Sequence, residues 1–251
     1  GADAQLQRLA DAAGGVDALL ERYAFIVAAD HGHTRVTQLV DLRDVFSDWN
    51  VRDPRATGSE SEEIAIGLSQ RSAMVWVLGD RDREATAERA AGDALRSPAV
   101  DLAMLRGRGE SRVLRAGREL RFAPGGDLTD ARGARWSIDG DLGVLGMTLI
   151  DGSIVSPEYP DALGRIQAAL DCPNAGDLLL SAAGGAEFAD WGGAGHLGGG
   201  SHGSLHRSDS HGALLWCGTG PDSRTVRDEW TVADVAGLVR GHFELDPRVA
   251  P

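Results

Sequence analysis

The chain has 251 residues and a formal net charge of −13, with 42% hydrophobic and 25% charged residues. These proportions are those of an ordinary globular domain, which argues against a disordered chain. An acidic surface repels phosphate backbones, which argues against general DNA or RNA binding. No apolar run reaches the ~18 residues that span a bilayer, and we see no signal peptide. The two cysteines, Cys172 and Cys217, form no CxxC pair, so a cysteine-based zinc site is excluded.

The N-terminal region has the pattern of an α/β protein. Residues 2–22 have the apolar spacing of a helix, interrupted at Gly14-Gly15. Residues 23–29 are a short apolar run typical of a buried parallel strand, and this run ends in the polar segment Asp30-His-Gly-His-Thr34. In open α/β sheets, the carboxyl ends of the strands are where functional sites form.

Residues 50–150 have a different pattern and few residues suited to catalysis, so we predict an inserted α+β or cap subdomain there. We expect two strands at 64–66 and 74–78 joined by a turn at 69–71, a helix over 81–96, and a hairpin of 111–116 with 118–123.

From residue 156 the α/β pattern returns, so residues 1–49 and 151–251 are predicted to form the core. We expect a helix over 161–171, buried strands at 177–181 and 213–217, a glycine-rich stretch over 192–203, and a helix over 231–243 with Thr231 as its N-cap. The predicted fold is α/β, with three αβα layers and a mostly parallel sheet.

Asp30 and His31 are the first candidate metal ligands. A carboxylate and an imidazole at the end of a strand can converge on one cation, and such oxygen and nitrogen donors suit zinc or manganese. Gly32 would allow a tight turn directly after them. The alternative is that Asp30 caps a turn and that His31 is an ordinary loop histidine.

His202 is the third candidate ligand. It lies in the glycine-rich segment Gly198–Leu205, just before the strand predicted at 213–217, and the glycines would let the backbone approach a metal ion or a phosphate. The alternative is a surface linker that contains a histidine. His206 is the first substitute for His202 if the ligand is misassigned.

Together, Asp30-His-Gly32 after an early strand and Ser201-His-Gly203 before a late strand resemble the alkaline phosphatase superfamily. The resemblance is strongest to its type I phosphodiesterase and nucleotide pyrophosphatase branch. It implies two divalent metal ions, Zn²⁺ or alternatively Mn²⁺, with Asp30 and His31 on one ion and His202 on the other. It also implies an alkaline-phosphatase-like core and a small phosphate ester or nucleotide as the substrate.

The family pattern is incomplete in this chain. The family also has an N-terminal Asp ligand, a Thr or Ser nucleophile and an Asp-x-x-x-His pair, which it places before the helix that begins here at about Ala2. We therefore expect these groups upstream of Gly1, in an N-terminal remainder of the same protein, and no turnover by this chain alone. The alternatives are a non-catalytic binding or interaction module that keeps the fold, or another branch such as a sulfatase or phosphomutase.

Overall fold

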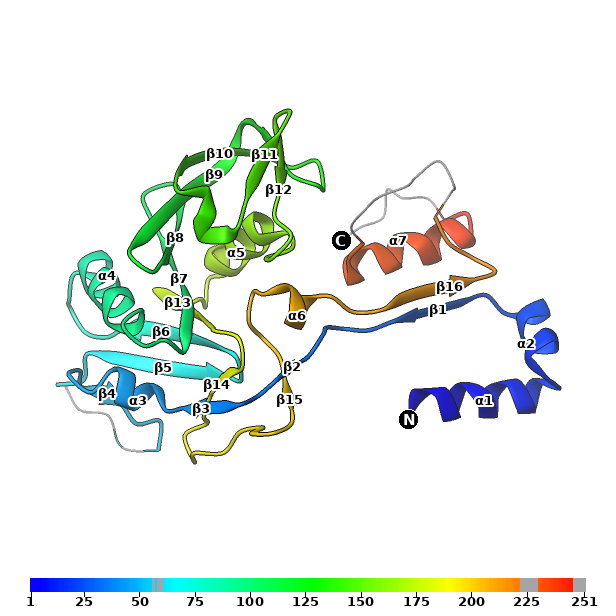
Figure 1. Ribbon diagram of the computed structural model, residues 1–251, viewed down its shortest axis with the longest axis horizontal. Coiled ribbons are helices and arrows are strands. Elements are labelled where there is room, and N and C mark those ends of the chain that lie inside the picture. Colours follow the sequence, from blue (N-terminus) through cyan, green and yellow to red (C-terminus); the bar gives the residue numbers. More distant parts are fainter. Residues whose placement is uncertain (56, 58–60, 222–229, 246–251) are drawn as a thin grey trace. The chain divides into compact units, whose positions relative to one another are not determined.

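The computed structural model describes residues 1–55, 57, 61–221 and 230–245. The chain divides into two compact units, and Figure 1 shows their elements. Unit 1 combines Gly1–Asp30 with Gly212–Pro251, and unit 2 comprises His31–His211. The boundaries between the units thus fall after Asp30 and before Gly212, whereas the sequence predicted boundaries near residues 50 and 150.

Unit 2 is built on a ten-stranded sheet. Its strand order is β11-β12-β9-β8-β7-β13-β6-β5-β4, and β10 also pairs with β9. The strands are β4 (Val51–Arg52), β5 (Ile64–Ser69), β6 (Ser72–Val77), β7 (Val100–Arg106), β8 (Ser111–Arg115), β9 (Arg118–Thr129), β10 (Arg135–Gly140), β11 (Thr148–Ile150), β12 (Ser153–Val155) and β13 (Leu178–Ala182).

The sheet is mostly antiparallel, so the predicted mostly parallel sheet is wrong for the described residues. Only β4 with β5 and β12 with β9 pair in parallel in this sheet, as far as the structure describes it. The predicted hairpins β5–β6 and β8–β9 are confirmed, and their short turns allow only antiparallel pairing. Strand β13, predicted for the core, lies between β6 and β7 of the predicted insertion and is antiparallel to both. Residues 50–150 therefore share one sheet with a strand from outside that range.

Helices cover both faces of the sheet in unit 2. On β13, Leu178 and Leu180 belong to one apolar cluster, and Leu179 between them belongs to the other, as expected for alternating side chains. Helix α4 (Arg83–Ala94) contributes four alanines to the first cluster, and α5 (Ala162–Asp171) contributes Leu163, Ile166 and Leu170 to the second. The mixed α/β character is therefore confirmed, and the burial predicted for the strand at 177–181 is confirmed with it.

Unit 2 also contains two separate two-stranded sheets. Strand β2 (Thr34–Arg35) pairs antiparallel with β15 (Gly200–Ser201), and β3 (Gln38–Val40) pairs parallel with β14 (Ala186–Phe188). The remaining elements are the helices α3 (Leu42–Val45) and α6 (Arg207–Ser210) and the 3₁₀ helix η1 (Leu142–Leu145).

Unit 1 contains α1 (Ala2–Ala13), α2 (Val16–Arg22), the antiparallel pair β1 (Phe25–Ala28) and β16 (Leu214–Cys217), and α7 (Val232–His242). The predicted break at Gly14-Gly15 is confirmed, because Gly14 ends α1 in the left-handed region at φ 95°. The predicted N-cap is also confirmed, since the amide of Thr231 donates to Asp234 at 2.8 Å in a capping box. No helix in the described ranges is long and apolar enough to cross a membrane.

The burial predicted for the two strands of unit 1 is wrong. The residues of β1 are half-buried or exposed, and those of β16 are mostly exposed. An apolar run is buried only where a second layer covers it, and each of these strands pairs with only one other strand in the described chain.

Candidate functional site

Two segments far apart in the sequence meet in unit 2. Strand β2 directly follows His33, and strand β15 directly precedes His202, so the antiparallel pairing of Thr34 with Ser201 brings these histidines to the same end of a short ladder. The amide of Gly32 also donates to the carbonyl oxygen of Asp209 at 2.9 Å. The two loops are therefore joined through their backbones on both sides of the histidines.

Gly32 is needed for close packing rather than for a turn. A Cβ atom at this position would lie 2.3 Å from the carbonyl oxygen of Ser208 and 2.6 Å from that of His211. The predicted tight turn is therefore not the reason for this glycine, because Gly32 is absent from the glycines with positive φ. The glycine instead lets the segment after His31 lie directly against α6.

Three imidazoles gather where these segments meet. The rings of His31 and His202 are stacked, with centroids 3.5 Å apart and an interplanar angle of 17°. The ring of His33 lies edge-on, 4.9 Å from the His31 centroid and 5.7 Å from that of His202. The structure thus brings together two of the three predicted ligands, together with His33, which was not among the predicted ligands.

The tautomer of His31 is set by its neighbour. His31 Nδ1 donates a hydrogen bond to the carbonyl oxygen of Gly32 at 2.8 Å, and a carbonyl can only accept. The proton of the neutral ring therefore lies on Nδ1, and the lone pair lies on Nε2. Histidines that bind metal ions are commonly oriented in this way, by a hydrogen bond from the other ring nitrogen.

The other two predicted residues are Asp30 and His206. Asp30 ends the first stretch of unit 1, so its predicted place beside His31 and His202 stays a prediction. His206 is the N-cap of α6, where its Nδ1 accepts from the amide of Ser208 at 3.2 Å. Its ring lies edge-on to Tyr159, with centroids 5.7 Å apart. It is His202 that stacks on His31, which favours His202 over its substitute.

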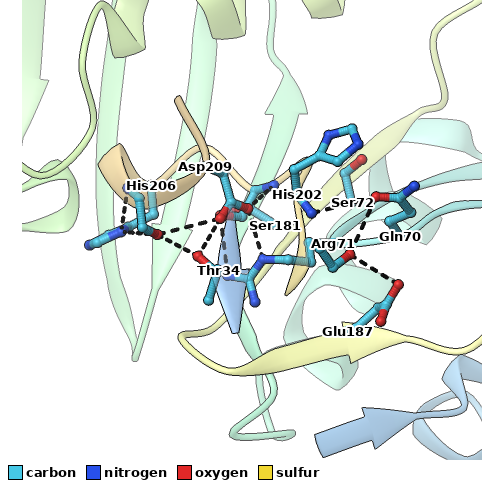
Figure 2. Close-up of polar contacts among 12 residues, drawn as sticks. Thr34, Gln70, Arg71, Ser72, Ser181, Glu187, His202, His206 and Asp209 are labelled. Atoms are coloured by element: carbon cyan, nitrogen blue, oxygen red, sulfur yellow. Dashed lines mark hydrogen bonds and ion pairs between the residues drawn. The ribbon is translucent and has the colours of Figure 1, made fainter. Parts of the chain in front are cut away.

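A buried carboxylate lies at the centre of this region, as Figure 2 shows. Asp209 is 3% exposed, and it accepts hydrogen bonds from the hydroxyl of Thr34, the amide of Ser204 and the guanidinium of Arg71. Burial alone would raise the pKa of Asp209, but these hydrogen bonds outweigh it and hold the pKa below the ordinary value. Asp209 is therefore a buried, charged residue that is hydrogen-bonded to both histidine-bearing segments.

A second buried carboxylate orders the start of the glycine-rich loop. Glu187 on β14 accepts from the amide and from Nδ1 of His196, both at 2.7 Å, and from the hydroxyl of Ser201 at 3.0 Å. Burial tends to raise the pKa of Glu187, but the hydrogen bonds from His196 and Ser201 hold it below the ordinary value. The loop between His196 and Ser201 is thus fixed at both ends by one side chain.

Arg71, Glu187 and Asp209 could not be identified as site residues from the sequence. Arg71 lies in the predicted turn between β5 and β6, where an arginine normally faces solvent, yet it is fully buried. Asp209 shows one usable signal, because it follows the Gly-Ser-His-Gly segment by a few residues. Glu187 has no such signal, since a single glutamate in a strand is ordinarily exposed.

The donor set in this region suits a divalent cation of the zinc class. Imidazole nitrogens are preferred ligands of zinc, and imidazoles a few ångströms apart can bind the same zinc ion or neighbouring ones. In the described parts of unit 2 and unit 1, no three His, Cys, Asp or Glu side chains converge as a ready-made metal cage.

Comparisons with known proteins give no family for this chain. No protein-family model matches it, and neither does any curated protein or any solved structure.

Proposed function

We propose that this chain is part of a metal-dependent phosphoester hydrolase of the alkaline phosphatase type, in the phosphodiesterase and nucleotide pyrophosphatase branch. The observation that carries the proposal is the stacking of His31 on His202 at 3.5 Å. The two histidines come from the two motifs on which the resemblance rests. Two unrelated loop histidines would not be expected to stack on each other, whereas histidines that bind neighbouring ions would lie close together.

The geometry of the two rings supports a two-metal site. Two imidazole rings stacked 3.5 Å apart can present their ring nitrogens side by side, and ions in two-metal hydrolases are ~3.5–4 Å apart. Under this proposal Asp30 and His31 hold one ion and His202 holds the other. Bound cations supply positive charge for the oxygens of a phosphate ester, and they offset the repulsion between that anion and a chain of net charge −13.

The residues of this chain have supporting roles in that proposal. The hydrogen bond from Nδ1 to Gly32 orients the His31 ring, and Asp209 fixes the loop that follows His202. The nucleophile and the remaining ligands are assigned to the N-terminal remainder of the protein, as the resemblance implies. We therefore expect this chain to bind metal ions through part of the ligand set and to hydrolyse nothing on its own.

The finer fold assignment is part of the same proposal. An alkaline-phosphatase-like core would extend the pair β1–β16 with further strands from the N-terminal remainder. The exposed apolar side chains of Val27, Leu215 and Trp216 are consistent with such an addition, because a completed sheet would have apolar residues on its covered faces.

Zinc titration of the 251-residue chain by isothermal calorimetry tests the proposal. We expect His31→Ala and His202→Ala each to lower Zn²⁺ affinity by more than ~100-fold, beyond the effect of losing an outer-shell group. His242→Ala in α7 is the matched control, and it should bind Zn²⁺ like the wild type. Equal affinity in the wild type and both site variants would reject the metal centre.

A phosphodiesterase assay separates the catalytic proposal from a binding module. Bis(4-nitrophenyl) phosphate should be hydrolysed by the protein that includes the N-terminal remainder, and only at background by this chain. Zinc binding without hydrolysis by the longer protein would favour the non-catalytic module. Robust turnover by the 251-residue chain would mean that its catalytic residues have been misassigned.

A further inference from the structure

We propose that the buried Arg71–Asp209 ion pair is a positioning device, which holds the His31 and His202 segments in register and thereby sets the stacking of their imidazoles. The inference deepens the proposed function, because it names residues that arrange the same site. Its test by ring geometry does not depend on metal binding or on catalysis.

Asp209 connects the two histidine-bearing segments directly. One carboxylate oxygen accepts from the hydroxyl of Thr34, three residues after His31. The other accepts from the amide of Ser204, two residues after His202, at 2.8 Å. The backbone carbonyl of Asp209 also accepts from the amide of Gly32 at 2.9 Å. One residue thus fixes the chain just after each of the stacked rings.

Arg71 anchors this connection to the sheet, as seen in Figure 2. Its Nε donates to Asp209 at 2.7 Å, and its Nη1 donates to the carbonyl of Ala186 at 2.6 Å. Its backbone amide donates to the carbonyl of His202 itself at 3.1 Å. Because Arg71 lies at the tip of the β5–β6 hairpin, the loop that contains His202 is held by the ten-stranded sheet of unit 2.

The ion pair is poorly suited to a purely stabilising role. Arg71 is 0% exposed and Asp209 is 3% exposed, so both charges have lost their contact with water. Replacing such a pair by apolar residues is often neutral or stabilising, because desolvation offsets the charge attraction. An apolar pair does not fix the relative orientation of the two segments. A guanidinium does, because it binds carboxylate and carbonyl oxygens at fixed angles.

The packing of Gly32 couples the position of His31 to that of Asp209. The close contact between Gly32 and the Ser208 carbonyl leaves no room for the two segments to slide past each other. A shift of Asp209 therefore moves Gly32, and the ring of His31 moves with it. The Arg71–Asp209 pair and the Gly32 contact together determine where the two imidazoles lie.

The test uses the double variant Arg71→Met/Asp209→Leu, which removes the pair without leaving a buried charge. The readout is the NOE between the ring protons of His31 and His202 in the metal-free, histidine-labelled chain. We expect the variant to remain folded, by circular dichroism and thermal unfolding, and to lose this NOE. Thr34→Val is a milder second variant, which removes one hydrogen bond to Asp209 and should weaken the NOE.

The control is Arg83→Met/Asp177→Leu. Asp177, just before β13, also accepts from an arginine, Arg83 at the start of α4, and from a backbone amide, that of Val77 on β6. The control should keep the ring NOE. Zn²⁺ affinity, measured by calorimetry, should fall ~10–100-fold in the Arg71/Asp209 variant, as for lost outer-shell groups, and should not change in the control.

The outcomes separate the two proposals. Loss of the NOE in the folded site variants but not in the control supports the positioning role, even if the wild type binds no Zn²⁺; in that case only the proposed function fails. A wild-type NOE retained in a folded double variant, or retained in Thr34→Val when the double variant unfolds, overturns the inference. Absence of the NOE from the wild type overturns it as well.

Discussion

A Cβ atom on Gly32 would lie 2.3 Å from the carbonyl oxygen of Ser208, so the segment after His31 and helix α6 are packed as closely as their backbones allow. This contact explains why a glycine follows His31. It also makes the position of His31, the first residue of unit 2, dependent on residues near the C-terminal end of that unit.

Gly32→Ala should destabilise unit 2 by about 1–3 kcal/mol, because the clash is with backbone atoms that cannot rotate away. The free energy of unfolding, measured with urea, checks this value. Gly184→Ala is the control, since a Cβ there meets no atom within 4 Å. It should change the stability by less than about 0.5 kcal/mol. Equal stability of the two variants would mean that the segments are not packed in this way.

Acid should weaken unit 2 through its two buried carboxylates. The pKa values of Asp209 and Glu187 are both lowered in the folded chain, so the unfolded state binds more protons between the folded and unfolded values. Their contribution is complete above the unfolded values of about 4, and it is lost as the pH falls through the lower folded values. Urea unfolding at a series of pH values should show stability decreasing below about pH 4–5.

Glu187→Gln tests how much of this loss of stability at acidic pH, the acid limb of the pH profile, depends on the Glu187 carboxylate. The variant cannot titrate at this position, so the decrease in stability on acidification should be smaller than in the wild type. At pH 7 the variant should be less stable by about 1.5–3 kcal/mol, because charge-assisted hydrogen bonds from His196 and Ser201 are weakened. An unchanged acid limb would show that Glu187 has a similar pKa in the folded and unfolded chains.

Unit 1 should exchange its backbone amides much faster than the centre of unit 2. Among the described residues of unit 1, only Ala10 and Leu238 are buried, and β1 and β16 pair only with each other. Strand β13 is buried along its whole length between two neighbours. Hydrogen exchange followed by mass spectrometry should show lasting protection in residues 178–182 and early exchange in 25–28 and 214–217. Equal protection of both regions would contradict this difference.

Local patterns in the sequence predicted individual elements well. The alternation on both sides of Gly117 predicted the β8–β9 hairpin, and the apolar run at 177–181 predicted a buried strand. The direction of pairing was not predictable in this way, because β13 reads the same whether its neighbours are parallel or antiparallel. The exposure of β1 and β16 was missed for a related reason, since burial depends on what packs against a strand.

The candidate site was partly predictable. His31 and His202 could be chosen because glycines surround them and because each lies next to a predicted strand. Arg71 could not, because a turn arginine becomes buried only when a carboxylate, a carbonyl and a loop converge on it from elsewhere in the chain. Such convergence is a property of the tertiary structure, and no local pattern records it.

The most direct test of the metal-centre proposal is a titration of the ¹⁵N-histidine-labelled chain with Zn²⁺, followed by the imidazole nitrogen resonances. We predict that Nε2 of His31 and a ring nitrogen of His202 shift together as Zn²⁺ is added, while the resonances of His242 stay unchanged. Resonances of His31 and His202 that do not respond to Zn²⁺, or a response confined to other histidines, would contradict it.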